Sequence, residues 1–197
     1  LKGVTDFDID TLRQVAWEIA EGSREVEYGG RPDVELYDKY GYHPIEDVTG
    51  RSVAWTQELA ISDFALGTLE DAIGEPSRAA YLLQRAGYWE NHYNPETGFF
   101  HARSMDGSFI ELESESAWED AYTEGNARQY RWLVPHDPEG LARVMGGDDV
   151  VIERLTELFE ESVIEIAEEG EGVIGFPSEW YWHGNEPDIH ASWLFAT

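Results

Sequence analysis

The side chains of this sequence that are best suited to chemistry lie in two polar clusters, about sixty residues apart. The first spans residues 122–137 and begins Tyr122-Thr123-Glu124-Gly125-Asn126. The second spans residues 183–190 and reads His183-Gly184-Asn185-Glu186-Pro187-Asp188-Ile189-His190. Carboxylates and carboxamides exchange hydrogen bonds with hydroxyl groups, and aromatic rings offer flat apolar faces. Both clusters therefore have the composition of a sugar-binding site.

Glu124 is the candidate for acid chemistry. Cleavage of a glycosidic bond needs a protonated carboxyl beside the leaving oxygen and a second carboxylate on the other side of the sugar. Aromatic neighbours of Glu124 would keep water away from such an acid, and Gly125 would let a substrate approach the backbone. The alternative is a glutamate that caps a helix or forms an ion pair with Arg128 or Arg131.

Two carboxamides of the first cluster, Asn126 and Gln129, can each donate and accept hydrogen bonds, which suits the recognition of sugar hydroxyls. Hydrogen bonding within a helix is an equally good interpretation of both. Asp137 precedes Pro138 and is expected to be the N-cap of a helix.

Asn185 and Glu186 carry the oxygen ligands that calcium prefers. An Asn cap followed by Glu in the first turn of a helix is the alternative, and one helix start can present both groups. Glu186 lies near His183 and His190, but the pair of histidines of a helical zinc protease site is missing, so zinc is set aside.

Both clusters resemble those of glycoside hydrolase family 92, the calcium-dependent exo-α-mannosidases, and the resemblance covers nearly the full chain. It implies an inverting hydrolase that removes terminal α-linked mannose from glycans or mannosides, with Glu124 as the catalytic acid. It also implies that Asn185 and Glu186 help to hold a Ca²⁺ ion that grips the mannose ring. The expected substrate-binding residues are Asn126, Gln129, Trp182 and His183.

The chain departs from the family pattern at two places. Arg128 stands where the family usually has Trp, which could remodel the pocket or pair with Glu124. Tyr181 and Trp182 replace the His-Glu pair of enzymes that cut α-1,2 linkages, so they could form an aromatic platform for another linkage. Core packing remains the default interpretation of any one of these rings.

The resemblance places the general base in an Asp pair after Thr197 and the sugar-gripping aspartates before Leu1. Residues 1–197 are therefore expected to be one segment, the middle portion of an (α/α)₆ catalytic domain truncated at both ends, whose remainder is its partner. The alternative is a non-catalytic α-toroid remnant that binds glycans or only packs.

The elements that position these clusters are predicted to be mainly α-helical. Asp8 or Asp10 is expected to cap a helix through Ile19, and the segment 29–50 reads as a loop. Apolar periodicity and turn residues predict the remaining elements. They are helices over 52–70, 76–93, 118–133, 138–145 and 148–168, a turn at 94–98, a β-hairpin over 99–103 and 108–112, a loop at 170–175, and a short helix from about Asn185.

Composition narrows the partners. Acidic residues outnumber basic ones 41 to 13, which gives a formal charge of −28. Such a surface repels nucleic acids and anionic membranes, and it is typical of proteins that work in concentrated salt, so we expect a halophilic source. The chain has no cysteine, which excludes disulfides, thiolate metal sites and a Cys nucleophile.

Overall fold

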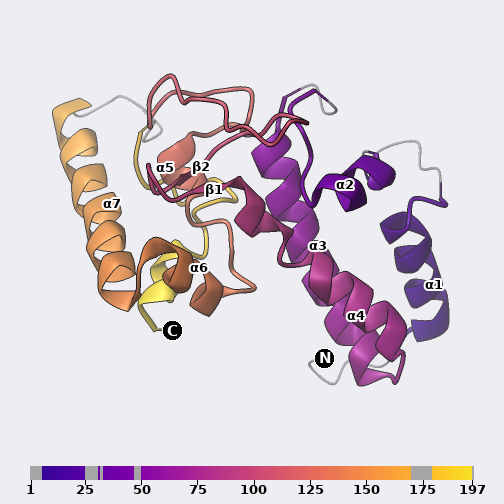
Figure 1. Ribbon diagram of the computed structural model, residues 1–197. Helices are drawn as coiled ribbons and strands as arrows, with labels where there is room; N and C mark the ends of the chain where they lie inside the picture. Colours follow the sequence, from indigo (N-terminus) through magenta and orange to yellow (C-terminus); the bar gives the residue numbers. More distant parts are fainter. Residues whose placement is uncertain (1–5, 25–30, 32, 47–49, 170–178, 197) are drawn as a thin grey trace.

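The computed structural model describes residues 6–24, 31, 33–46, 50–169 and 179–196, and these form a mainly helical fold with one small β-hairpin, as predicted (Figure 1). The hairpin pairs β1 (Tyr93–Asn94) with β2 (Phe99–Phe100), antiparallel, with Tyr93 opposite Phe100. None of the helices in the described part of the chain is long and apolar enough to cross a membrane. The α-helices are α1 Ile9–Ala20, α2 Val34–Tyr40, α3 Ser52–Ala72, α4 Pro76–Arg85, α5 Ala127–Tyr130, α6 Pro138–Met145 and α7 Asp148–Glu169, and the 3₁₀ helices are η1 Tyr88–His92 and η2 Ala191–Ala196.

Helices α3 and α4 form an antiparallel hairpin that runs through one side of the molecule, with α1 and α2 beside it (Figure 1). Gly74, at φ +87°, makes the turn, and Pro76 begins α4 at the position where a missing N–H costs nothing. On the other side, α6 and α7 pack together with η2. The β-hairpin of β1 and β2 and the long loops lie between these two groups of helices.

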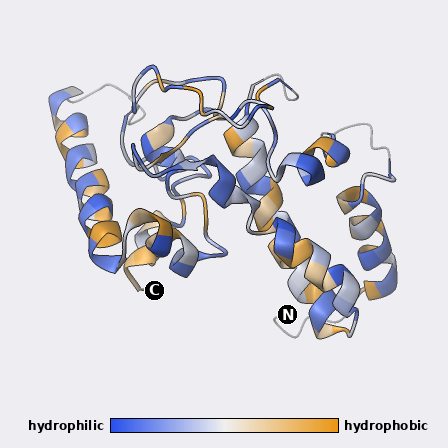
Figure 2. Cartoon of the chain, in the orientation of Figure 1, coloured by the Kyte–Doolittle hydropathy of each residue, from blue (hydrophilic) through white to orange (hydrophobic). Residues whose placement is uncertain are grey.

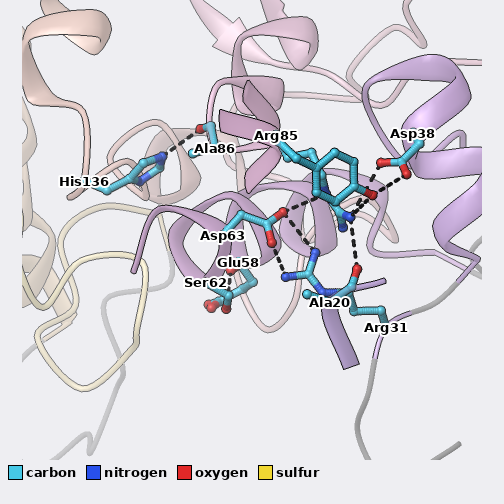
Figure 3. A network of polar contacts seen from close by, with 10 residues as sticks. Ala20, Arg31, Asp38, Glu58, Ser62, Asp63, Arg85, Ala86 and His136 are labelled. Atoms are coloured by element: carbon cyan, nitrogen blue, oxygen red, sulfur yellow. Dashed lines mark hydrogen bonds and ion pairs between the residues drawn. The ribbon is translucent and has the colours of Figure 1, made fainter. Parts of the chain in front are cut away.

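A buried arginine–aspartate network joins the helices of the first group (Figure 3). Asp63, on α3, accepts hydrogen bonds from both terminal nitrogens of Arg31 and from Nε of Arg85, at 3.0 Å, on α4. Arg85 also donates to the carbonyl of Ala20, at the end of α1 (2.9 Å), and lies 3.6 Å from Asp38 on α2. One carboxylate therefore holds two guanidinium groups, and one guanidinium ties four helices together.

A single apolar core runs from the start of α3 across the hairpin to α7. Trp89 and Trp132 are its largest fully buried side chains, and Leu155 and Leu158 contribute the apolar stripe of α7. Figure 2 shows this pattern as bands, because α7 carries apolar residues along one side and acidic residues along the other. The loops around residues 99–134 are thus fixed from both sides.

Several predicted elements are confirmed. Asp8 caps α1 by accepting a hydrogen bond from the Thr11 amide (3.0 Å), and Asp137 caps α6 through the Gly140 amide (2.9 Å). Helices α3, α6 and α7 begin within a residue of the expected positions. Part of the predicted loop 29–50 and all of the loop 170–175 lie outside the described residues.

Other predictions are wrong in extent. The helix expected over 118–133 is only the single turn α5, because the cap at Asn126 starts it late and Pro135 follows soon after. The helix expected over 76–93 ends at Arg85 and resumes as η1 after Gly87. The hairpin lies around the turn at 94–98 instead, while 103 and 109 form only an isolated bridge, and the helix expected from Asn185 is η2, further on.

Helix α2 was missed within the segment predicted as a loop. Its signals are present in the sequence. The side chain of Asp33 accepts from the Leu36 amide (3.0 Å) at the start, and Gly41, at φ +72°, ends the helix in the left-handed conformation. Seven residues between two glycine-rich stretches were too few for periodicity to show.

Replacing Asp63 with Ala is expected to lower the free energy of unfolding by about 3–5 kcal/mol, because it removes the buried carboxylate that Arg31 and Arg85 share and leaves Arg85 with only Asp38, at 3.6 Å. Urea unfolding of the protein followed by tryptophan fluorescence measures this change. The matched control is Asp71→Ala, since Asp71 is exposed on the same helix. Equal stability of the two variants would show that the network does not hold the helices.

Candidate active site

The start of helix α3 holds the loop that precedes Glu124. The first N–H groups of an α-helix have no partner within the helix. The amides of Val53 and Ala54 donate to the carbonyl of Ala121 (3.2 and 3.3 Å), and the Arg51 amide donates to the carbonyl of Asp120. Arg51, at the N-cap, supplies no side-chain cap, so the loop carbonyls cap α3 in its place.

The phenol of Tyr130, on α5, holds the next part of the same loop. It accepts a hydrogen bond from the Thr123 amide (3.1 Å) and donates to the Thr123 carbonyl (2.8 Å). The carboxamide of Gln57, on α3, donates to the backbone carbonyl of Tyr130 (3.1 Å). The backbone on the N-terminal side of Glu124 is therefore fixed by α3 and α5 together.

Glu124 has a strained backbone. Its φ is +51° and that of Arg51 is +65°, and these are the two non-glycine residues with positive φ among those that the structure describes. Side chains other than glycine rarely adopt this left-handed region, and such strain gathers at functional sites. Both residues line one hollow of about 540 Å³, the site hollow, formed by Arg51, Ala54, Trp55, Glu58, Thr123, Glu124, Tyr130 and Glu186.

The two polar clusters meet at this hollow. Nδ2 of Asn185, which is buried, donates to the backbone carbonyl of Glu124 (2.6 Å). Oδ1 of the same carboxamide accepts from the Glu186 amide (3.0 Å). Asn185 thereby joins two segments that are 61 positions apart and turns Glu124 and Glu186 toward the same space.

Asn126 and Gln129 are fully buried and form a capping box at the start of α5. Asn126 also donates to the Glu179 carbonyl (3.3 Å), and Gln129 donates to the Trp180 carbonyl (2.9 Å). These contacts agree with the alternative interpretation of the two carboxamides, in which they form hydrogen bonds at a helix. Their contact with substrate stays a prediction.

Packing requires a glycine at position 125, which the sequence interpretation did not include. A Cβ at this position would lie 2.9 Å from Oε1 of Gln129 and 3.0 Å from a ring carbon of Tyr130. A side chain at this position would therefore collide with side chains of α5, while the approach of a substrate to the Gly125 backbone stays a prediction. The residue type is needed because the loop and the helix approach so closely.

Arg128 points away from Glu124. Its guanidinium lies 3.4 Å from Glu115 and 3.1 Å from Glu179, and it stacks 3.9 Å above the ring centre of Trp180. The alternative in which Arg128 pairs with Glu124 is therefore not borne out. Glu124 is exposed in the site hollow, so the exclusion of water expected from Tyr122, Tyr130 and Trp132 is not seen; of these three rings only Tyr130 lines the site hollow.

Trp182 and His183 lie beside the site hollow but outside the residues that line it. The indole of Trp182 is partly buried against Gly184, where a Cβ would lie 2.5 Å from its Nε1. His183 is exposed, and its Nδ1 is hydrogen-bonded to the hydroxyl of Tyr181. Their contact with substrate also stays a prediction.

Asp188 is fully buried and does not line the site hollow. Its Oδ2 accepts from the Trp182 amide (3.0 Å), and this bond closes the turn that carries Asn185 and Glu186. Burial raises the pKa of Asp188 to about 8, because the charged form loses its water. Its structural role is to shape the turn, and its position does not suit a base that activates water.

Glu58 is the residue of the site hollow that the sequence interpretation missed. It lies on α3, one and two turns after Ala54 and Arg51, so all three face the hollow. Crowding by protein atoms, and then the charge of Glu186, raises the pKa of Glu58 although its side chain is accessible. The signal was the spacing of Arg51, Ala54, Trp55 and Glu58 along one helix face.

The fit of a calcium ion depends on donor type and number. Asn185 and Glu186 offer a carboxamide and a carboxylate oxygen, which are suitable donors, and Ca²⁺ takes about six to eight oxygens. Among the described residues, no three His, Cys, Asp or Glu side chains gather closely enough to hold a metal. These residues therefore fit one part of a calcium site and do not complete it.

Comparison with known proteins identifies the family. A model of the glycosyl hydrolase family 92 catalytic domain matches residues 1–197. The chain belongs to glycosyl hydrolase family 92. The fold class expected from the resemblance, part of an (α/α)₆ barrel, agrees with this membership.

Solved family 92 structures superpose closely on the chain. The inverting mannosidase BT2199 of Bacteroides thetaiotaomicron is 28% identical, with a TM-score of 0.83 over 98% of this chain and 27% of its own. The α-mannosidase BT3965 of the same organism is 29% identical, with a TM-score of 0.78 over 98% of this chain and 24% of its own. The latter has also been solved in complex with mannoimidazole.

A curated relative from the fungus Arthroderma benhamiae, an uncharacterized secreted glycosidase, is 24% identical over 84% of this chain and 23% of its own length. The family 92 chain thus spans about a quarter of the length of the relatives that it matches.

Replacing Asn185 with Asp is expected to lower the free energy of unfolding by about 1–3 kcal/mol, because a carboxylate oxygen would face the Glu124 carbonyl in place of a donor. Urea unfolding measures this. The control is Asn94→Asp: the side chain of Asn94 accepts from the Glu96 amide, a bond that a carboxylate keeps. Equal losses at the two positions would contradict the donor role of Asn185.

Proposed function

We propose that the protein containing this chain is an inverting exo-α-mannosidase that removes terminal α-linked mannose from glycans or mannosides. The observation that supports this most is the Asn185 bond to the Glu124 carbonyl, which brings Glu124 and Glu186 to one hollow within a family 92 chain. The inverting mannosidase and the mannoimidazole complex among the structural relatives support the reaction type and the sugar.

In this proposal Glu124 is the general acid. Its carboxyl is exposed in the site hollow, where a leaving-group oxygen can reach it, while its backbone is held by Asn185. An acid placed in this way protonates the oxygen as the glycosidic bond breaks. The carboxylate that activates water belongs to another part of the family 92 barrel, at the greater separation that inversion requires.

A calcium ion is the second part of the proposal. Glu186 and Asn185 would supply a carboxylate and a carboxamide oxygen to it, and the rest of the barrel would complete the ligands. When bound, calcium supplies a positive charge that organises the hydroxyl groups of the terminal mannose. Asn185 would then position both the acid and the ion, since it contacts the backbone of Glu124 and of Glu186.

Replacing Glu124 with Gln in the full-length protein should reduce kcat on mannosides with poor leaving groups by about 10²–10⁴-fold, because Gln cannot donate a proton to the leaving oxygen. A mannoside with a nitrophenolate leaving group should lose much less. Steady-state kinetics on the two substrates measure the difference. Glu111→Gln, at an exposed position, is the control and should leave both rates unchanged. Near wild-type rates for Glu124→Gln on the poor leaving group would refute the acid role.

Removal of divalent ions with a chelator should abolish activity, and added Ca²⁺ should restore it. In Glu186→Gln the Ca²⁺ concentration for half-maximal activity, and the dissociation constant from calorimetry, should rise about tenfold or more, because a charged ligand is lost. Glu139→Gln, exposed on α6, should match the wild type. Full activity in the presence of the chelator would reject the calcium site.

A further inference from the structure

A second hollow collects an unusual share of the positive charge of the chain. Only eleven arginines and two lysines stand against 41 acids. Three of these arginines, Arg128 on α5, Arg131 just after it and Arg154 on α7, line one hollow of about 330 Å³, the arginine hollow, together with the β-hairpin turn and Trp180. It is lined by different residues from the site hollow.

Two of the three arginines are neutralised by glutamates. Arg128 pairs with Glu115 and with Glu179, and Arg154 pairs with Glu157 at 2.9 Å. The remaining acid of the lining, Glu96, is exposed to solvent, where its charge is screened.

Arg131 is the exception. It is 8% exposed, and within the described residues its guanidinium forms no ion pair and donates only one hydrogen bond, from Nε to the Gly98 carbonyl (3.1 Å). Burial, and then the charge of Arg154, lowers the pKa of Arg131 to about 10, although Glu115 and Glu157 offset part of this. Burying a charge without a counter-ion is unfavourable, so the buried guanidinium of Arg131 destabilises the fold.

The orientation of the guanidinium groups is fixed by aromatic rings. Arg131 lies 3.9 Å from the ring centre of Phe99, and Arg128 lies at the same distance from that of Trp180. Stacking occupies the faces of these planar groups and leaves their edges for hydrogen bonds. The terminal nitrogens of Arg131 can therefore offer a fork of N–H donors, the geometry that matches two oxygens of a carboxylate or phosphate.

We propose that the arginine hollow is a binding site for an oxyanion, a phosphate, sulfate or carboxylate group, with Arg131 as its main contact and Arg154 as its second. Its volume lies at the small end of ligand pockets, so the group is borne by a ligand no larger than about one sugar unit or is a free anion. The anion supplies the counter-charge that Arg131 lacks. The proposal is independent of the mannosidase function, because Glu124 and Glu186 take no part in it.

Calorimetric titration of the full-length protein with inorganic phosphate, at constant ionic strength, tests this site. Saturable binding is expected in the wild type, and Arg131→Gln should weaken it about tenfold or more, because a charge-assisted bidentate contact is lost. Arg143→Gln is the matched control. Arg143 is exposed on α6, pairs with Glu90 at 2.6 Å and lies outside the arginine hollow, so this variant should bind phosphate as tightly as the wild type.

Tryptophan fluorescence reports whether Arg131→Gln keeps its fold. If it does not, Arg154→Gln tests the proposal in its place. Arg154 lies largely at the surface, so this substitution should leave the fold intact and weaken phosphate binding about threefold. A wild type that binds neither phosphate nor glucuronate, or a folded variant at either position with unchanged affinity, would overturn the proposal. Titration with mannose 6-phosphate and with glucuronate separates the sources: tenfold tighter binding than phosphate indicates a sugar-borne group, and equal binding indicates the free anion.

Discussion

The hydrogen bond from the Asn185 carboxamide to the Glu124 carbonyl is the contact on which the candidate site depends. On the N-terminal side of Glu124, the loop is held by the free amides of α3 and by the phenol of Tyr130. On the other side, the buried carboxylate of Asp188 closes the turn that carries Asn185. Each support uses a polar group that burial would otherwise leave without a partner, so the same bonds that stabilise the loops also set the position of Glu124.

The long helices could be predicted, and the two polar clusters could be singled out, because both leave a local signal. The spacing of apolar residues indicates α7 over 22 residues, and the two polar clusters are recognised by their amino-acid composition. The four-residue helix α5 could not be delimited, since its start depends on a cap whose carboxamides also bind residues fifty positions away. Glu58 was missed for a related reason. On a helix that is mostly buried, only the tertiary arrangement decides which glutamate opens onto a hollow.

Charge is distributed in a way that net charge alone conceals. The chain is strongly acidic, yet two of its arginines are buried: Arg85 beside Asp63, and Arg131 beside Phe99. The first is compensated within the fold and stabilises it, while the second lacks a counter-ion among the described residues. Arginine suits both roles because its charge persists in a buried setting and its planar group can stack and donate at the same time.

Helix α3 connects the buried network to the active-site loop as one rigid rod. Asp63 lies twelve residues after Arg51, about 18 Å along the axis at 1.5 Å per residue. Over that length a tilt of about 3° displaces the far end by about 1 Å, and a misplacement of this size can cost a rate of about 10²-fold. Small packing changes among the first four helices therefore have leverage over catalysis. Variation in a region without any chemistry of its own could thus change the rate of the hydrolysis that we propose for the whole protein.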